Sequence, residues 1–213
     1  MKNFYKLSIV ALVSLMGLSV SAQELPKLGI EAGVNISNSS MDVGPLDKKA
    51  RVGFQIGITA DYAITDAWHL QSGLSYTTKG GKVEGSLMQD AASHKYTVNQ
   101  SYIQLPIYAA YKIEVVPGTK IVFNVGPYLA YGVGGSVKAG NGYLNIDNDE
   151  GNIDTFGKDG VLNRFDFGLG AGVGAEFGNI IATIRYELGL VNIGQDNLDY
   201  KNRNAALTLG YRF

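Results

Sequence analysis

Apolar and polar residues alternate with a period of two along most of this 213-residue chain. In the segment 28–37, for example, Leu28 and Ile30 alternate with Gly29 and Glu31. Eight segments follow the pattern, and they are 28–37, 52–62, 68–77, 102–113, 120–131, 164–177, 180–190 and 207–213. A period of two places successive side chains on opposite faces of a β-strand. The pattern therefore predicts eight strands, each with one apolar face.

The composition indicates how these strands are assembled. Charged residues make up 17% of the chain and glycine contributes 28 of 213 residues, against averages of about 25% and about 7% in soluble domains. A low charge fraction is typical of membrane proteins, yet no apolar run after residue 22 approaches the 18 residues of a spanning helix. A closed β-barrel is the other architecture that satisfies every backbone group in lipid. We predict an all-β fold, an eight-stranded antiparallel up-and-down transmembrane β-barrel.

Aromatic residues at the ends of the apolar faces indicate which face meets lipid. Two belts of aromatic rings flanking an apolar band are typical of a membrane barrel. The first belt comprises Tyr62, Trp68, Tyr111, Phe177, Tyr211 and Phe213, and the second comprises Phe54, Tyr76, Tyr131, Phe165 and Phe167. The alternative is a soluble barrel with its apolar face inward. Its outer surface would then be mostly glycine, Asn, Thr and Gln, which would solubilise it poorly.

The connections alternate in length around the predicted barrel. The long ones are 38–51, 78–101, 132–163 and 191–203, and the short ones are 63–67, 114–119 and 178–179. Outer-membrane barrels have long external loops and tight periplasmic turns. The alternation predicts four external loops and places both ends of the barrel domain on the periplasmic side.

The first 22 residues have the layout of a cleaved signal peptide. Lys2 and Lys6 precede an apolar stretch at 7–20, and Ser21-Ala22 offers small residues for cleavage before Gln23. We expect the barrel domain to be 23–213, exported and inserted in the outer membrane. The chain has no cysteine, which excludes a Cys-linked lipid anchor, disulfides and Cys-based metal sites. Without 1–22, 16 Lys and Arg face 19 Asp and Glu, a net charge of -3 that gives no support to nucleic-acid binding.

Three short motifs resemble the PorT-like outer-membrane β-barrels of the Bacteroidota. They are Tyr102-Ile-Gln-Leu-Pro106, Gly126-Pro-Tyr128 and the ending Gly210-Tyr-Arg-Phe213. The resemblance extends over roughly 25–213 and implies the fold and the outer-membrane location. Gln104 stands where the family often has Glu. Phe213 resembles the terminal aromatic residue that the barrel-assembly machinery reads, which makes this machinery an expected partner.

Ionisable residues on the polar face would project into the lumen. They are Glu31, Asp61, Lys112, Asp166, Glu176, Arg185, Glu187 and Arg212. Eight strands leave a lumen that side chains fill, and buried charges must be paired. We expect a structural network, with Glu176 meeting Arg185 and Glu187 meeting Arg212 on neighbouring strands. A narrow, gated ion path is the alternative.

The segment 164–177 carries four glycines on its polar face, Gly168, Gly170, Gly172 and Gly174. Part of it, from Gly170 to Ala175, matches the loose G-x-G-x-x-A form of a dinucleotide-binding loop. That motif requires a turn followed by a helix, and no helical period follows here. We interpret it as a strand whose glycines leave room for side chains from across the lumen, with Tyr108, Tyr128, Arg185 and Lys112 as the candidates.

No other motif supports a cofactor, a metal or catalysis. The acidic stretch 145–160 departs from the calcium-loop pattern because Gly151 and Asn152 occupy its fifth and sixth positions, so a solvated loop is favoured. The chain has two histidines: His69 is expected near the periplasmic rim, facing inward, and His94 in an external loop without an evident acidic partner. A catalytic base normally needs an orienting third group, and no such arrangement is visible. We expect no enzyme activity.

The sequence thus predicts a porin-like or structural outer-membrane barrel whose external loops make surface contacts. We expect outer-membrane lipid and lipopolysaccharide as its surroundings, and a monomer. An accessory role in protein secretion is one alternative, and a lipid A-modifying barrel enzyme is the least favoured one.

Overall fold

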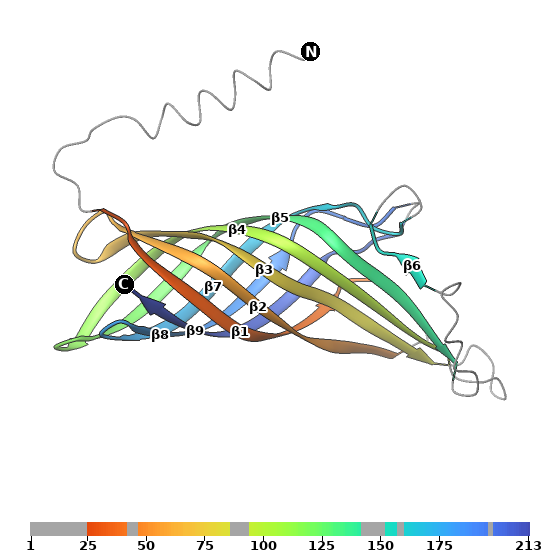
Figure 1. Ribbon diagram of the computed structural model, residues 1–213, viewed down its shortest axis with the longest axis horizontal. Coiled ribbons are helices and arrows are strands. Elements are labelled where there is room, and N and C mark those ends of the chain that lie inside the picture. Colours follow the sequence, from red (N-terminus) through yellow and green to blue (C-terminus); the bar gives the residue numbers. More distant parts are fainter. Residues whose placement is uncertain (1–24, 42–46, 86–93, 142–151, 157–159, 196–197) are drawn as a thin grey trace, which may run out of the picture.

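The computed structural model describes residues 25–41, 47–85, 94–141, 152–156, 160–195 and 198–213 (Figure 1). The strands are β1 (Lys27–Ser39), β2 (Asp47–Ala63), β3 (Trp68–Gly85), β4 (His94–Val116), β5 (Thr119–Asn141), β6 (Asn152–Asp154), β7 (Phe165–Phe177), β8 (Ile180–Gly189) and β9 (Asn202–Arg212). Within these described ranges, no helix is long and apolar enough to cross a membrane. The predicted signal peptide, 1–22, lies outside them.

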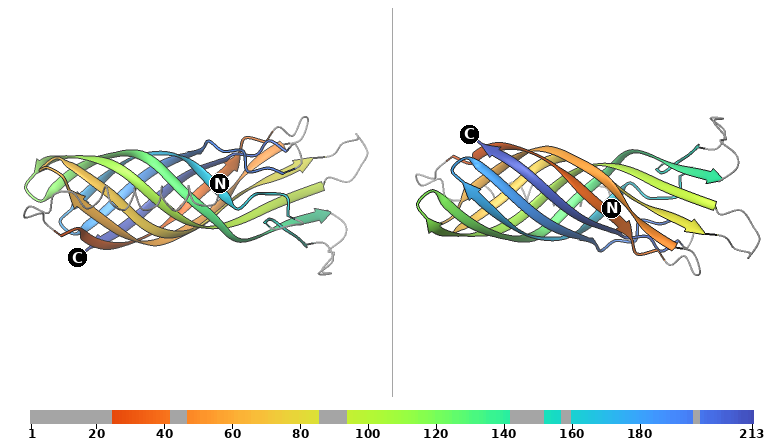
Figure 2. Two further views of the ribbon diagram at one scale, coloured as in Figure 1. Left: turned by 90° about the horizontal axis from the view of Figure 1, so that it is seen from above. Right: turned by 90° about the horizontal axis from the view of Figure 1, so that it is seen from below.

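Each strand pairs with its neighbours in antiparallel fashion, and the sheet closes on itself. The order is β1-β2-β3-β4-β5-β7-β8-β9, and β9 returns to pair with β1 from Arg212 opposite Gly29 to Asn202 opposite Ser39. The ninth strand, β6, only adds three residues to the far end of β5. The predicted eight-stranded antiparallel barrel is confirmed, and both views in Figure 2 show tilted strands wrapping one axis.

The two ends of the barrel differ. At one end, hereafter the turn end, 64–67, 117–118 and 178–179 join the strands tightly, and the last residue of the chain also lies there (Figure 1). Gly118 and Gly178 have φ values of 79° and 59°, which glycine adopts without steric cost, and the amide of Gly178 donates to the Gly118 carbonyl at 2.9 Å. The opposite end, hereafter the loop end, carries the long connections and β6.

Burial follows the alternation of the sequence. Along β9, the lumen side holds the buried Asn202, Asn204 and Thr208, whereas Leu207 and Leu209 on the other face are 50% and 63% exposed. The apolar face therefore points outward. The aromatic rings of the first belt lie on this outer face at the turn end, where the ring centroids of Trp68 and Tyr111 are 5.0 Å apart.

Several strands are longer than the alternation predicted. β3, β4 and β5 continue through much of 78–101 and 132–141, which the sequence assigned to loops, and β9 begins at Asn202 rather than at 207. His94 is consequently the first residue of β4 instead of a loop residue. Beyond the lipid neither face of a strand needs to be apolar, so these extensions lack the hydrophobic signal on which the prediction depended.

The glycines of β7 form a flat wall that side chains from across the lumen cover. A Cβ atom on Gly168 would lie 2.6 Å from the Tyr128 ring, and one on Gly170 would lie 2.6 Å from the Tyr108 hydroxyl. The prediction that these two tyrosines fill the space is confirmed. The Arg185 side chain lies beside Gly172 and that of Thr183 beside Gly174. The Lys112 ammonium binds Asp61 and Glu176.

Adding a methyl group to the wall should destabilise the barrel through Tyr108. We expect Gly170→Ala to lower the free energy of unfolding by about 1–3 kcal/mol, the usual cost of overpacking. Urea titrations of the protein refolded in phospholipid vesicles, followed by heat-dependent gel mobility, would measure it. Gly134→Ala is the matched control, because a Cβ there meets no atom within 4 Å.

A double-mutant cycle would assign the cost to the contact. Tyr108→Phe removes the hydroxyl that the new methyl group meets, so the cost of Gly170→Ala should shrink in the Tyr108→Phe background. An equal cost in both backgrounds would contradict this account.

Candidate functional site

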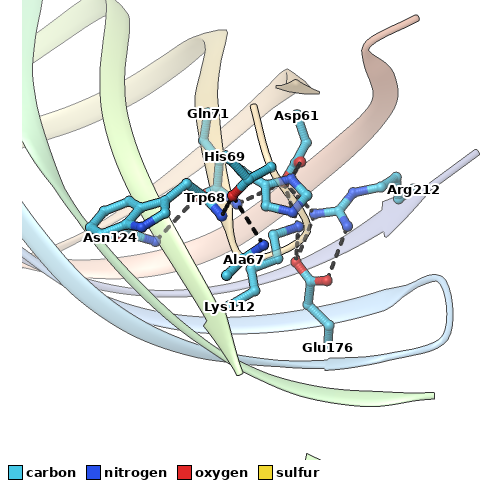
Figure 3. A network of polar contacts seen from close by, with 10 residues as sticks. Asp61, Ala67, Trp68, His69, Gln71, Lys112, Asn124, Glu176 and Arg212 are labelled. Atoms are coloured by element: carbon cyan, nitrogen blue, oxygen red, sulfur yellow. Dashed lines mark hydrogen bonds and ion pairs between the residues drawn. The ribbon is translucent and has the colours of Figure 1, made fainter. Parts of the chain in front are cut away.

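A four-residue ion cluster, formed by Asp61, Lys112, Glu176 and Arg212, occupies the lumen at the turn end (Figure 3). Lys112 Nζ lies 2.8 Å from Asp61 Oδ2 and 2.9 Å from Glu176 Oε1. Arg212 Nη2 lies 3.0 Å from the same Asp61 oxygen and 2.9 Å from the same Glu176 oxygen. Each carboxylate thus binds both cations, and the formal charges of the cluster cancel.

Neighbouring polar groups hold the Asp61 carboxylate in place. His69 Nδ1 lies 2.6 Å from Asp61 Oδ1, and the Gln71 amide donates to Asp61 Oδ2 at 2.8 Å. Asn124 donates in turn to the Gln71 side-chain oxygen at 3.4 Å. Together with the ion cluster, these side chains come from β2, β3, β4, β5, β7 and β9. One polar network therefore links six strands of the barrel wall.

A polar cavity of about 670 Å³ opens at the turn end next to this cluster. Asp61 and His69 belong to its lining, together with Lys27, Glu114 and Lys120. A second cavity, of about 60 Å³, lies deeper and touches Glu31, Asp61, Arg185 and Arg212. The ion cluster therefore separates an open mouth from a small internal space, which can hold about two water molecules.

Glu187 organises the middle of the lumen. Its Oε1 accepts hydrogen bonds from the Gln104 amide at 2.6 Å and from the Tyr108 hydroxyl at 3.3 Å. Its Oε2 accepts from Asn204 at 3.1 Å and lies 3.2 Å from Lys79 Nζ. Both Glu187 and Lys79 are fully or almost fully buried, so their charges compensate each other inside the barrel.

Arg185 and Glu31 flank this layer with fewer direct contacts. The Arg185 guanidinium stacks on the Tyr108 ring, 4.7 Å from its centroid, and its buried Nε has no hydrogen-bond partner. Glu31 accepts one long hydrogen bond from Gln55, at 3.5 Å. Both residues line the 60 Å³ cavity, where water would satisfy their remaining polar atoms.

Asp166 lies higher in the lumen, completely buried. Its Oδ2 accepts hydrogen bonds from Asn202 at 2.9 Å and from the Tyr128 hydroxyl at 3.3 Å. Lys79 Nζ lies over the face of the Tyr128 ring, 4.4 Å from the centroid. A tyrosine thus stands between the positive and the negative charge.

An apolar plug closes the lumen at the loop end. It consists of buried residues from the barrel wall and from the long connections, namely Tyr102, Tyr128, Ala130, Phe156, Leu162, Ile193 and Tyr200. Phe156 packs so closely on Gly132 that a Cβ there would lie 2.6 Å from its ring. The Tyr200 hydroxyl accepts a hydrogen bond from Gln100 at 2.8 Å, and burial raises the pKa of Tyr200 to about 12. Between the internal cavity and the loop end, the described side chains therefore fill the lumen.

The structure places all eight predicted charged residues on the lumen side, but with other partners than expected. Glu176 stands opposite Ile181 in the ladder, so Arg185 is four residues farther along β8, about 13 Å away. Likewise, Glu187 stands opposite Asn204, eight residues from Arg212. The pairs Glu176–Arg185 and Glu187–Arg212 were wrong because membership of neighbouring strands does not fix the height along them.

Several residues of the lumen escaped the sequence analysis, above all Lys79, which lay in a presumed loop. A signal was present, because Lys79 continues the lumen-side series Ser75, Thr77 at every second position. Asn202 and Asn204 similarly precede Thr208 on the same face of β9.

The acidic stretch lies mostly outside the described residues. Asp147, Asp149, Glu150 and Asp159 are among those not described, and Asp154 is exposed in β6. Elsewhere in the described chain, no group of three His, Cys, Asp or Glu side chains could hold a metal ion.

Comparison with protein families agrees with this architecture. The model of the outer membrane protein beta-barrel domain matches residues 22–195. The chain belongs to this family. Membership places the barrel in the outer membrane. In barrels of this membrane the tight turns face the periplasm and the long loops face outward. The match ends before β9, which closes the barrel in the structure.

Solved barrels that resemble the chain share little sequence with it. Ail, the attachment invasion locus protein of Yersinia pestis, solved with the heparin analogue sucrose octasulfate, is 17% identical with a TM-score of 0.45, covering 89% of this chain and 100% of Ail. Neisserial surface protein A is 16% identical with a TM-score of 0.44, covering 87% and 97%. OprG from Pseudomonas aeruginosa is 11% identical with a TM-score of 0.42, covering 90% and 97%. No curated protein matches the sequence.

Breaking the ion cluster from one side should destabilise the barrel strongly. We expect Lys112→Met to cost about 3–5 kcal/mol, because it leaves a buried carboxylate undercompensated. The single tryptophan, Trp68, lies beside the cluster and reports unfolding by fluorescence. Lys120→Met is the matched control, since Lys120 lies at the same rim and forms no described ion pair.

The neutral pair replacement distinguishes charge from packing. Asp61→Asn combined with Lys112→Met removes one charge of each sign, so the double variant should lose less stability than the two single losses together. Additive losses would show that the four charges do not act as one cluster.

Proposed function

We propose that this chain is a non-conducting, structural outer-membrane barrel that acts through its extracellular surface. The observation that carries the proposal is the filled lumen. Tyr108 and Tyr128 cover the glycine wall of β7, and Phe156 and Tyr200 belong to the plug above them. An ion would have to displace these side chains and cross the apolar layer.

The extracellular extensions support the second half of the proposal. β3, β4 and β5 continue beyond the outer aromatic residues Tyr76 and Tyr131 as a sheet that reaches Gly85 and Asn141. Paired strands hold side chains more rigidly than loops do, so this sheet presents a defined surface to the environment.

A narrow ion path is the second candidate, and the cavities favour it. The 670 Å³ mouth and the 60 Å³ internal space are both lined by charged groups, with the ion cluster between them. Such a path would be porin-like only if the plug and the two tyrosines moved aside together.

The proposal assigns no catalytic role to this barrel. His69 is oriented by Asp61, but within the described residues no serine hydroxyl hydrogen-bonds to its ring. An accessory role in secretion, implied by the PorT-like motifs, predicts that deletion of the gene blocks the export of other proteins. That phenotype together with an electrically silent barrel would replace the structural proposal.

Planar-bilayer recordings should show no discrete conductance steps for the purified protein. Replacing Tyr108, Tyr128 and Phe156 by glycine should introduce steps, because it uncovers the β7 wall and removes a ring from the plug. The matched control replaces Tyr131, Phe165 and Tyr186, whose side chains are 55%, 52% and 51% exposed on the outer face, and should stay silent.

Arg185 provides the opposite test. Discrete steps in the wild-type protein whose ion selectivity changes with Arg185→Glu would establish the ion path and refute the closed barrel. A closed barrel predicts that this substitution alters stability alone.

A further inference from the structure

Basic residues line up across the outer face of the extracellular sheet. Lys49 in β2 stands opposite Lys82 in β3, Lys82 stands opposite Thr97 in β4, and Thr97 stands opposite Lys138 in β5. We call Lys49, Lys82 and Lys138 the basic row. Val98, the residue after Thr97, packs against the apolar plug, so Thr97 and the basic row face away from the lumen.

The basic row has few counter-charges. Glu84 binds Lys49, whereas Lys82 and Lys138 form no ion pair with any described residue. Like charges directly opposite each other destabilise a sheet. Lys49 and Lys82 are such a pair; Glu84 offsets the charge of Lys49, which leaves the charge of Lys82 without a described counter-ion. Asp47 in β2 and Asp154 in β6 are further carboxylates on the strands of this sheet.

Arg51 extends the positive surface toward the membrane. Its side chain crosses Gly80, where a Cβ would lie 3.3 Å from Arg51 Cδ, and its Nε donates to Asn99 Oδ1 at 2.8 Å. Its Nη1 reaches the Lys79 carbonyl at 3.4 Å. These contacts fix the guanidinium on the outer face without neutralising it. Phe54, which belongs to the second aromatic belt, follows three residues later.

We propose that the basic row and Arg51 bind phosphate groups of lipopolysaccharide in the outer leaflet. The row lies on the same outward face as the lipid-facing residues, six residues beyond Tyr76 in β3, on the side from which the phosphate-bearing headgroups of the outer leaflet extend. Four strands at about 4.8 Å spacing make it about 14 Å wide, enough to contact more than one phosphate of a large headgroup. Arg51 contributes a planar fork of donors and the lysines contribute point charges. This inference does not depend on whether the lumen conducts.

Binding of purified lipopolysaccharide to the refolded barrel in detergent micelles tests the proposal. We expect Lys82→Gln combined with Lys138→Gln to weaken binding about thirtyfold, since each basic residue near an anionic surface is worth about 1 kcal/mol. The affinity of the wild-type protein should fall with added salt, and less steeply for the double variant. Lipopolysaccharide stripped of its phosphates should bind wild-type and variant alike.

The matched control is Lys48→Gln combined with Lys120→Gln. Lys48 is adjacent to Lys49 but on the opposite face, with its Nζ donating to the Met41 carbonyl at 2.9 Å, and Lys120 lies at the periplasmic mouth. This control removes the same net charge and should bind normally. Equal weakening by both double variants would overturn the proposal, as would undiminished binding of dephosphorylated lipopolysaccharide to the wild-type protein. Heat-dependent gel mobility checks that every variant is folded, and the dephosphorylation arm needs no variant.

Discussion

The closure of β9 onto β1 is the constraint on which the rest of this structure depends. A barrel in lipid cannot leave a strand edge unpaired, because no solvent is available for its backbone groups. The eleven register pairs from Gly29–Arg212 to Ser39–Asn202 remove the last free edge. Closure with eight strands also fixes the width of the lumen, which then has room for side chains and little else. The side chains that face the lumen must therefore fill it closely, and their charges must also cancel.

The lumen meets both demands by dividing its charges into layers. At the turn end, two carboxylates share two cations in the cluster of Asp61, Lys112, Glu176 and Arg212. In the middle, Glu187 and Lys79 compensate each other, and polar amides and hydroxyls take up the remaining lone pairs. Large rings need room that a wall of β-branched residues would deny them, and the glycines of β7 provide it. The resulting interior resembles a polar core more than a pore, which is why we assign the activity of the barrel to its outside.

The sequence predicted the architecture because lipid imposes a strict alternation. Leu207 and Leu209 on one face and Thr208 on the other are placed correctly by period alone. The hydrophobic period predicts strands only where one face meets lipid. Lys79 and Asn202 belong to strands, but their neighbours on the outer face are polar or small. The sequence therefore carries no hydrophobic period at these two residues. Pairing was the second limit. Strand membership shows which side a charge faces, whereas the partner of Glu176 depends on its height in the ladder, which the register and the tilt of the strands decide.

The alternation also explains why a charged surface arises just outside the membrane. A strand that turns apolar side chains to lipid turns the same series of positions outward after it leaves the lipid, since side-chain direction follows residue parity wherever the ladder is regular. Along β3 the outward series passes from Leu74 and Tyr76 to Lys82, while the inward series reaches Lys79 beneath the plug. The bulge between Ala50 and Gln55 of β2 shifts the register so that Lys49 comes opposite Lys82. Glu84 compensates Lys49, whereas Lys82 forms no described ion pair, and an anionic headgroup is the neighbour that its position in the membrane supplies.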